Sequence, residues 1–344
     1  MRKREGTLDL IRIIASFGVL TIHVLAWLLE QPYTELEKYF LWVVHTLAPT
    51  GTRLFVMITG YFLLAYEFQK SLLVVSRKIR ALFLPLFVWS LFYGVVFVLE
   101  FSSGSLFERI ETIKSFLVNL LDGRPYYHLW YLFLLPFLLA VVPYLVSIRE
   151  RISDMSFLKL GIFLLLFRFF DFAWRAQQNQ RVWIPLLTVD YLSLLILGYW
   201  LGRTILSMST TQKITVRKLS VLGIGISLLS SLFMPYSHLF HFGSLTVFED
   251  VLRTLYMIFL FSFALTFHLK STPLLTNLAY YGMGIYLIHP VLRTIIVTLV
   301  PYEWFFALPI GATVMVFIVV VYTISILFSA LLYKFPGTRK LISL

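Results

Sequence analysis

Ten long apolar runs, each bounded by charged residues or by proline and glycine, dominate the amino-acid sequence. They cover residues 9–29, 39–66, 80–100, 128–148, 156–173, 184–206, 216–235, 249–268, 274–299 and 305–333. About 20 apolar residues suffice for one helical crossing of a bilayer. Since a segment in lipid must satisfy its backbone hydrogen bonds internally, these runs predict helices. The sequence therefore predicts an all-α polytopic membrane protein with about ten transmembrane helices.

The composition excludes a soluble fold. Of the 344 residues, 59% are hydrophobic and 13% are charged, whereas soluble domains carry about 25% charged residues. The connections between the runs are too short for an extramembrane domain, so residues 1–344 are expected to form a single transmembrane domain. The absence of cysteine excludes a thiol nucleophile and cysteine-ligated metals.

The net charge of +12 is explained by membrane topology. Lys and Arg collect in cytoplasmic loops. If the N-terminus is cytoplasmic, that side receives 18 Lys and Arg residues and the other side six. We therefore expect both termini in the cytoplasm, the lipid bilayer as a partner and no nucleic acid.

Ionisable side chains inside the predicted spans point to a functional site, because such groups are costly in a bilayer. They are Arg12, His23, Arg53, Asp190, Arg253, His289 and Arg293. Arg168 and Asp171, near the outer end of their span, are instead expected to snorkel to the interface.

Arg12 and His23 are expected on one face of the first span. Eleven helical steps bring His23 to within about 20° of Arg12 and about 16 Å further along the helix. Asp9 can pair with Arg12 on the same face. A cation near the cytoplasm with a deeper imidazole suits a channel for a charged cytosolic molecule. In the alternative, Arg12 snorkels and His23 only hydrogen-bonds a neighbouring helix.

Two further segments carry arginines. The residues around Pro49 and Gly51 predict a helix broken near mid-membrane, with Arg53 pointing into protein or water. The alternative is a kink that serves packing alone. Arg77 and Arg80, three residues apart, can clamp phosphates, although basic clusters at such positions also serve as topogenic signals or lipid contacts.

Aromatic and histidine residues mark the predicted outer side. The run from Tyr126 to Tyr131 is expected to open the fourth span at the outer face, where His128 and Trp130 either stack on a sugar or belong to an aromatic belt. His289 is expected to be buried beside Pro290. His238 and His241 lack a third ligand nearby, so no metal site is expected.

Four motifs together resemble the acyltransferase-3 family of ten-span bacterial membrane O-acyltransferases over nearly the whole chain. Arg12 and His23 match its Arg-x10-His signature, and residues 55–62 are similar to its Phe-Phe-x-Ile-Ser-Gly segment, with Thr59 in place of the usual serine. Arg77 and Arg80 match its Arg-x-x-Arg motif. Residues 284–289 are similar to its Tyr-Leu-Ile-His span.

The resemblance implies transfer of an acetyl group from cytosolic acetyl-CoA to a carbohydrate hydroxyl in the bacterial cytoplasmic membrane, without a metal. The segment 127–130 is similar to the branch that acetylates surface polysaccharides. The expected roles fall into three groups. They are catalysis by His23, Arg12 and Asp9, donor or oxyanion binding by Arg77, Arg80, Arg53, Thr59 and Gly60, and acceptor binding by Tyr127, His128, Trp130 and His289.

Two other functions are compatible with broken helices and buried charges. One is a transporter or flippase for a glycan-related substrate, although the Arg-x10-His span has no counterpart in the second half of the chain. The other is a non-catalytic membrane partner in glycan synthesis, which would leave the intramembrane ionisable groups without a role.

Overall fold

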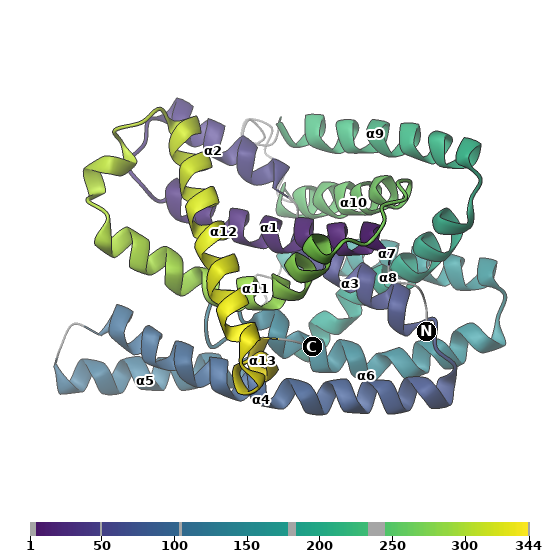
Figure 1. Ribbon diagram of the computed structural model, residues 1–344, viewed down its shortest axis with the longest axis horizontal. Helices are drawn as coiled ribbons and strands as arrows, with labels where there is room; N and C mark the ends of the chain where they lie inside the picture. The colour runs from purple at the N-terminus through teal and green to yellow at the C-terminus, as the bar shows by residue number, and fades with distance from the viewer. Residues whose placement is uncertain (1–4, 49, 103–104, 178–183, 233–244, 343–344) are drawn as a thin grey trace.

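The computed structural model describes residues 5–48, 50–102, 105–177, 184–232 and 245–342, which are helical throughout apart from short connections and contain no strand (Figure 1). The helices are α1 (Gly6–Leu29), α2 (Glu35–Leu47), α3 (Gly51–Leu63), α4 (Phe68–Phe101), α5 (Leu106–Leu121), α6 (Trp130–Arg151), α7 (Asp154–Gln177), α8 (Ile184–Ser207), α9 (Thr210–Leu232), α10 (Leu245–Leu265), α11 (Pro273–Leu299), the 3-10 helix η2 (Tyr302–Phe305), α12 (Ile310–Lys334) and α13 (Pro336–Ile342). The predicted all-α class is confirmed.

Every predicted span corresponds to a helix or a pair of helices. Within the described ranges, seven segments are long and apolar enough to cross a membrane, and they lie in α1, α2 with α3, α4, α6, α8, α11 and α12. The other three predicted spans are α7, α9 and α10, of 24, 23 and 21 residues. Each of these is about 30 Å long or longer, enough to cross the hydrocarbon core. The chain is therefore a multi-pass membrane protein.

Helix α1 lies in the middle of the bundle and contacts α2, α3, α10, α11 and α12 (Figure 1). The second crossing is broken as predicted, since α2 ends at Leu47 and α3 begins at Gly51. A Cβ atom on Gly51 would lie 2.0 Å from the carbonyl oxygen of Ala15. Glycine at this position therefore lets the start of α3 approach the backbone of α1.

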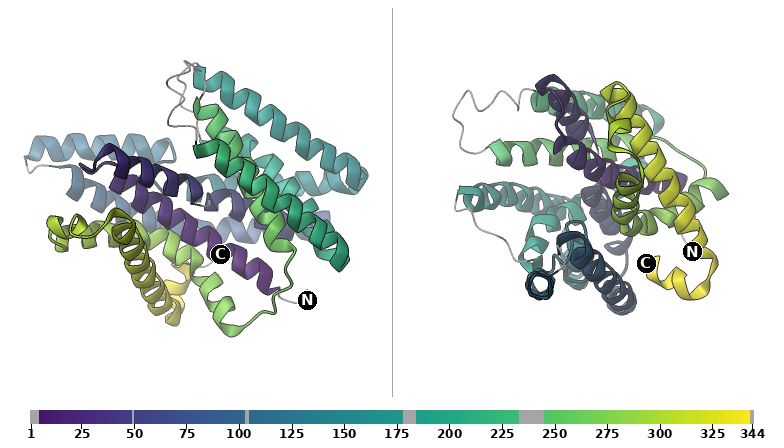
Figure 2. Two further views of the ribbon diagram at one scale, coloured as in Figure 1. Left: turned by 90° about the horizontal axis from the view of Figure 1, so that it is seen from above. Right: turned by 90° about the vertical axis from the view of Figure 1, so that its left-hand side faces the viewer.

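A second break in the chain separates α5 from α6, which both pack against α4. Residues 101–127 lie between two of the predicted spans, but α5 within them runs back alongside α4 (Figures 1 and 2). Phe116 of α5 packs against Gly94 and Phe97 of α4. Gly123, with φ 74°, follows the end of α5. Residues 122–129 are irregular, and α6 continues the path from Trp130.

The irregular segment lies deep in the membrane. Residues 81–99 of α4 contain no charge, and they span about 28 Å, close to the thickness of the hydrocarbon core. Tyr93 is near the middle of this stretch, and its ring lies 4.7 Å from that of His128. The sequence predicted the segment around His128 at the outer face, but this contact places it near mid-membrane. Non-helical backbone is tolerated at such depth where protein surrounds it.

The predicted sidedness can be tested on this naturally cysteine-free chain. Ser76 on α4 and Glu303 on η2 are both exposed, and the charge distribution places them on opposite sides of the membrane. In intact cells, Glu303→Cys should react with a membrane-impermeant maleimide, and Ser76→Cys should react only after permeabilisation. Labelling of Ser76→Cys in intact cells would contradict the topology.

Candidate active site

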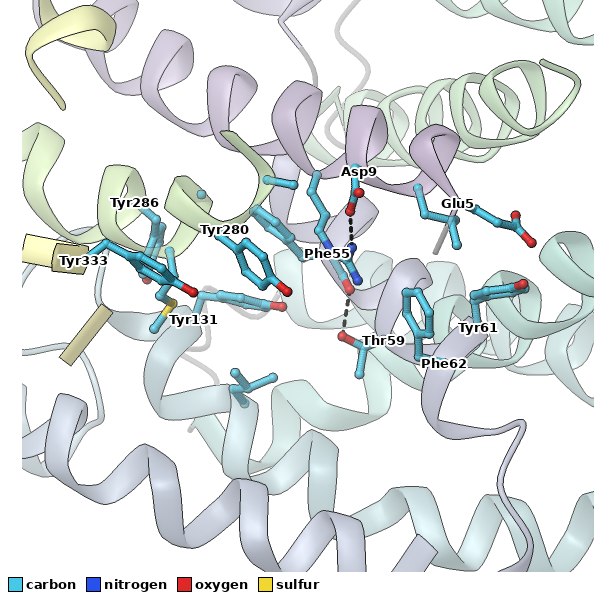
Figure 3. Close-up of a pocket in the computed structure, with 16 residues that line it drawn as sticks. Glu5, Asp9, Phe55, Thr59, Tyr61, Phe62, Tyr131, Tyr280, Tyr286 and Tyr333 are labelled. Carbon is cyan, nitrogen blue, oxygen red and sulfur yellow. Dashed lines mark hydrogen bonds and ion pairs between the residues drawn. The ribbon is translucent and has the colours of Figure 1, made fainter. Parts of the chain in front are cut away.

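A cavity of about 640 Å³ lies between α1, α3, α6, α11 and α12, toward the N-terminal end of α1 (Figure 3). Its wall includes Arg12 and Asp9 from α1, Thr59 from α3, and an aromatic group contributed by three different helices. This group consists of Tyr131, Tyr280, Tyr286 and Tyr333. The cavity thus combines a cation near the predicted cytoplasmic side with an aromatic wall.

Arg12 lines this cavity and also a second one of about 370 Å³, which extends to Lys78 of α4. The Arg12 guanidinium donates to the buried carboxylate of Asp9 at 2.8 Å, which confirms the predicted pair. It also lies 5.0 Å from the centre of the Phe62 ring. These contacts hold a charged group in place where the two cavities meet.

The two arginines of the Arg-x-x-Arg motif do not line either cavity. Arg77 and Arg80 are exposed on α4, and Arg80 donates through Nε to the carbonyl of Ser76 at 3.2 Å. Lys78, which is not among the predicted donor-binding residues, lines the second cavity instead. The sequence could have indicated this role for Lys78, because it lies between the two motif arginines. Residues one or two positions apart on a helix point in different directions, so Lys78 must face away from the arginines.

Three histidines from distant parts of the sequence meet near mid-membrane. The ring of His23 on α1 stacks on that of His289 on α11, with centroids 5.4 Å apart. The ring of His128 lies edge-on to His289 at 5.6 Å. Because His289 Nδ1 bonds the carbonyl of Ile285 at 3.0 Å, the orientation of this ring is fixed by its own helix. The predicted residues His23, His128 and His289 thus form one cluster.

His128 is enclosed and has no face open to a sugar. The residue is only 1% exposed. The rings of Tyr93, Tyr126 and Tyr286 surround its imidazole, with centroids 4.7 to 5.7 Å away. Within the described ranges, neither ring nitrogen has a hydrogen-bond partner. The predicted sugar-stacking role of His128 is therefore not supported by its position.

Tyr286 separates the cavity from the histidine cluster. It lines the cavity, and its hydroxyl donates to the backbone carbonyl of His128. On the opposite side of the cluster, His23 is half-buried and its ring lies 4.9 Å from that of Tyr127, which is 42% exposed. His23 is therefore the most accessible of the three histidines, and it lines neither of the two cavities.

Arg53 belongs to a separate buried charge cluster. It pairs with Asp250 of α10, which also accepts a bond from Arg168 at 2.6 Å. Arg168 is 5% exposed and does not snorkel as expected, because Asp250 and Thr254 provide partners inside the bundle. Since Arg53 points into protein, as predicted, but lines neither cavity, its expected role in donor binding is not supported.

Thr59 and Gly60 lie where α3 meets the cavity and α8. Thr59 lines both cavities, and its hydroxyl donates to the carbonyl of Phe55 at 2.8 Å (Figure 3). A Cβ atom on Gly60 would lie 2.0 Å from the carbonyl oxygen of Leu195. Gly60 therefore serves the packing of α3 against α8, and its position inside a helix commits its N–H to the backbone.

The remaining predicted residues are peripheral or undescribed. Trp130 is half-buried and packs beside Tyr131 and Tyr191, at ring distances of 6.1 and 6.2 Å. His238 and His241 lie outside the described residues. Among the residues that the structure does describe, no group of three or more histidines or carboxylates is arranged to hold a metal ion.

The comparison with protein families agrees with the motifs. The family model of the acyltransferase domain named acyltransferase-3 matches residues 5–334. No curated protein and no solved structure matches the chain. The matched region includes the two cavities, the histidine cluster and every predicted site residue. The chain therefore belongs to the acyltransferase-3 family, and it is a membrane acyltransferase.

Proposed function

We propose that the protein transfers an acetyl group from cytosolic acetyl-CoA to a hydroxyl of a cell-surface polysaccharide or its lipid-linked precursor, in a bacterial cytoplasmic membrane. One observation carries this proposal. A cavity lined by Arg12 is also lined by Tyr286, which bonds to a histidine cluster whose accessible member, His23, contacts the exposed ring of Tyr127 outside that cavity. A donor and an acceptor can thus approach the cluster from opposite sides.

The donor side offers the groups that coenzyme A requires. Arg77 and Arg80 are exposed and can bind phosphates outside the cavities, while Arg12 and Lys78 offer positive charge within them. The aromatic wall suits the less polar arm that ends in the thioester. In this arrangement the acetyl group is presented toward Tyr286 and the histidines.

His23 supplies the chemistry of the transfer. As a general base, its neutral imidazole takes the proton of the acceptor hydroxyl while the oxygen attacks the thioester carbonyl. The new carbon–oxygen bond forms, the carbon–sulfur bond breaks, and the imidazolium returns the proton to the coenzyme A thiolate. As a nucleophile, His23 would instead carry the acetyl group between the same two partners. Both routes require the imidazole of His23.

The direct test is an assay of the reconstituted protein with radiolabelled acetyl-CoA and a panel of polysaccharide precursors. Transfer of the label to a saccharide hydroxyl supports the proposal. Movement of a glycan across the membrane without transfer of label would indicate a transporter and would contradict it.

The position of Lys78 makes a quantitative prediction about donor binding. Lys78→Ala should raise the KM for acetyl-CoA about tenfold, as expected for one lost charge-assisted contact, and should leave the KM for the acceptor unchanged. Arg77→Ala and Arg80→Ala should act in the same direction. Lys218→Ala, which removes an exposed cation remote from the cavities, is the matched control. Equal changes in both KM values would exclude a specific role in donor binding.

A further inference from the structure

Arg293 lies on the accessible side of the histidine cluster. It follows His289 by one turn of α11, and its guanidinium lies 5.5 Å from the centre of the Tyr127 ring. The same ring is 4.9 Å from that of His23. Arg293 and His23 therefore contact one exposed aromatic surface from two different helices. Arg293 does not line the cavity on the other side of Tyr286.

No ion pair or hydrogen bond involves the Arg293 guanidinium within the part of the chain that the structure describes, and its Nε is buried without a partner. The other arginines inside the bundle differ in this respect, since Arg53 and Arg168 share Asp250. The carboxylate of Glu100 accepts hydrogen bonds from the Tyr126 hydroxyl at 2.6 Å and from the Thr294 hydroxyl at 3.1 Å, and it forms no ion pair with Arg293. Arg293 thus retains its capacity to bind an anion.

A partly desolvated cation that makes no direct ion pair is unfavourable in a membrane protein, so such a residue indicates a ligand that supplies an anionic partner. Arginine recognises carboxylates and phosphates through paired hydrogen bonds. The position of Arg293 beside His23, on the side opposite the donor cavity, assigns this ligand to the acceptor.

We propose that Arg293 binds a carboxylate or phosphate group of the acceptor, so that the protein acetylates an acidic saccharide or a glycosyl phosphate. The inference rests on the proposed function and specifies its substrate class. The two distances to the Tyr127 ring place the guanidinium and the His23 imidazole at most about 10 Å apart. That reach matches an acidic group and a reactive hydroxyl on the same or adjacent saccharides, with Tyr127 offering a face for stacking.

The test compares three small acceptors with the full-length protein in lipid nanodiscs, namely methyl glucuronide, glucose 1-phosphate and methyl glucoside. The wild type should show a KM at least about tenfold lower for one or both anions than for the neutral glucoside.

Arg293→Gln should remove this difference by raising the KM for the anion, with kcat and the KM for methyl glucoside nearly unchanged. Arg109→Gln, on the exposed face of α5, is the matched control. If Arg293→Gln raises the KM for methyl glucuronide, the recognised group is a carboxylate. If it raises the KM for glucose 1-phosphate, the recognised group is a phosphate.

Two outcomes would overturn the proposal. One is a wild type without preference for either anion. The other is an equal fall in kcat with all three acceptors in Arg293→Gln, which would place Arg293 in the chemical step. Thermal unfolding separates this inference from the proposed function. If the wild type transfers no label to these acceptors or to the polysaccharide precursors, the proposed function fails, whereas stabilisation by an anion in the wild type but not in Arg293→Gln still supports the anion site.

Discussion

His23→Ala should lower the rate of acetyl transfer by at least about a hundredfold, since a positioned acid–base group contributes about 10²- to 10⁴-fold. The expected loss is in kcat, because His23 lies in the histidine cluster rather than in the walls of the donor cavity. Initial rates with labelled acetyl-CoA measure the effect. Binding of acetyl-CoA by the variant should remain close to that of the wild type.

Two other histidines serve as controls for this experiment. His268→Ala removes an exposed imidazole on the predicted cytoplasmic side and should leave both activity and stability unchanged. His128→Ala removes a ring enclosed by tyrosines and should lower the free energy of unfolding by about 2–4 kcal/mol through the cavity that it leaves. His23→Ala should instead inactivate a protein that still unfolds near the wild-type temperature. Wild-type turnover in His23→Ala would exclude its catalytic role.

Interactions within one helix or between adjacent segments were predictable from the sequence. The Asp9–Arg12 pair follows from a separation of three residues, and the break between α2 and α3 follows from proline and glycine in an apolar run. The helices themselves follow from the lengths of the apolar runs. Each of these features depends on local spacing, which a single sequence contains.

Contacts between distant helices were not predictable in the same way. Arg168 was expected at the interface, but its partner Asp250 lies 82 residues away. The depth of His128 was missed because the charges in the first half of α5 are typical of a loop, while its uncharged second half carries the chain back into the membrane. The family motifs named the residues of the histidine cluster, but only the structure shows that they meet.

Gly60→Ala should have a large effect on both stability and activity. The added Cβ atom would lie 2.0 Å from the carbonyl oxygen and 2.7 Å from the Cα atom of Leu195, so the backbones of α3 and α8 must separate. Overpacking of this kind typically costs about 1–3 kcal/mol and sometimes more. Helix α3 also carries Thr59 and Phe62, which line both cavities. Acetyl transfer should therefore fall together with the unfolding temperature.

Two further glycine substitutions show whether this effect belongs to the α3–α8 contact. Gly198→Ala approaches the same interface from α8, with its Cβ atom 2.1 Å from the carbonyl oxygen of Met57, and should cause a similar loss. Gly225→Ala on α9 has no heavy atom within 4 Å of the new Cβ, so the higher helix propensity of alanine should leave stability unchanged or raise it by up to about 1 kcal/mol. If all three variants unfold at the wild-type temperature, the close approach of α3 and α8 is not required for the fold. If the unfolding temperature and acetyl transfer fall in Gly60→Ala and Gly198→Ala but not in Gly225→Ala, Gly60 acts by positioning the cavity wall. This role is separate from the chemistry at His23.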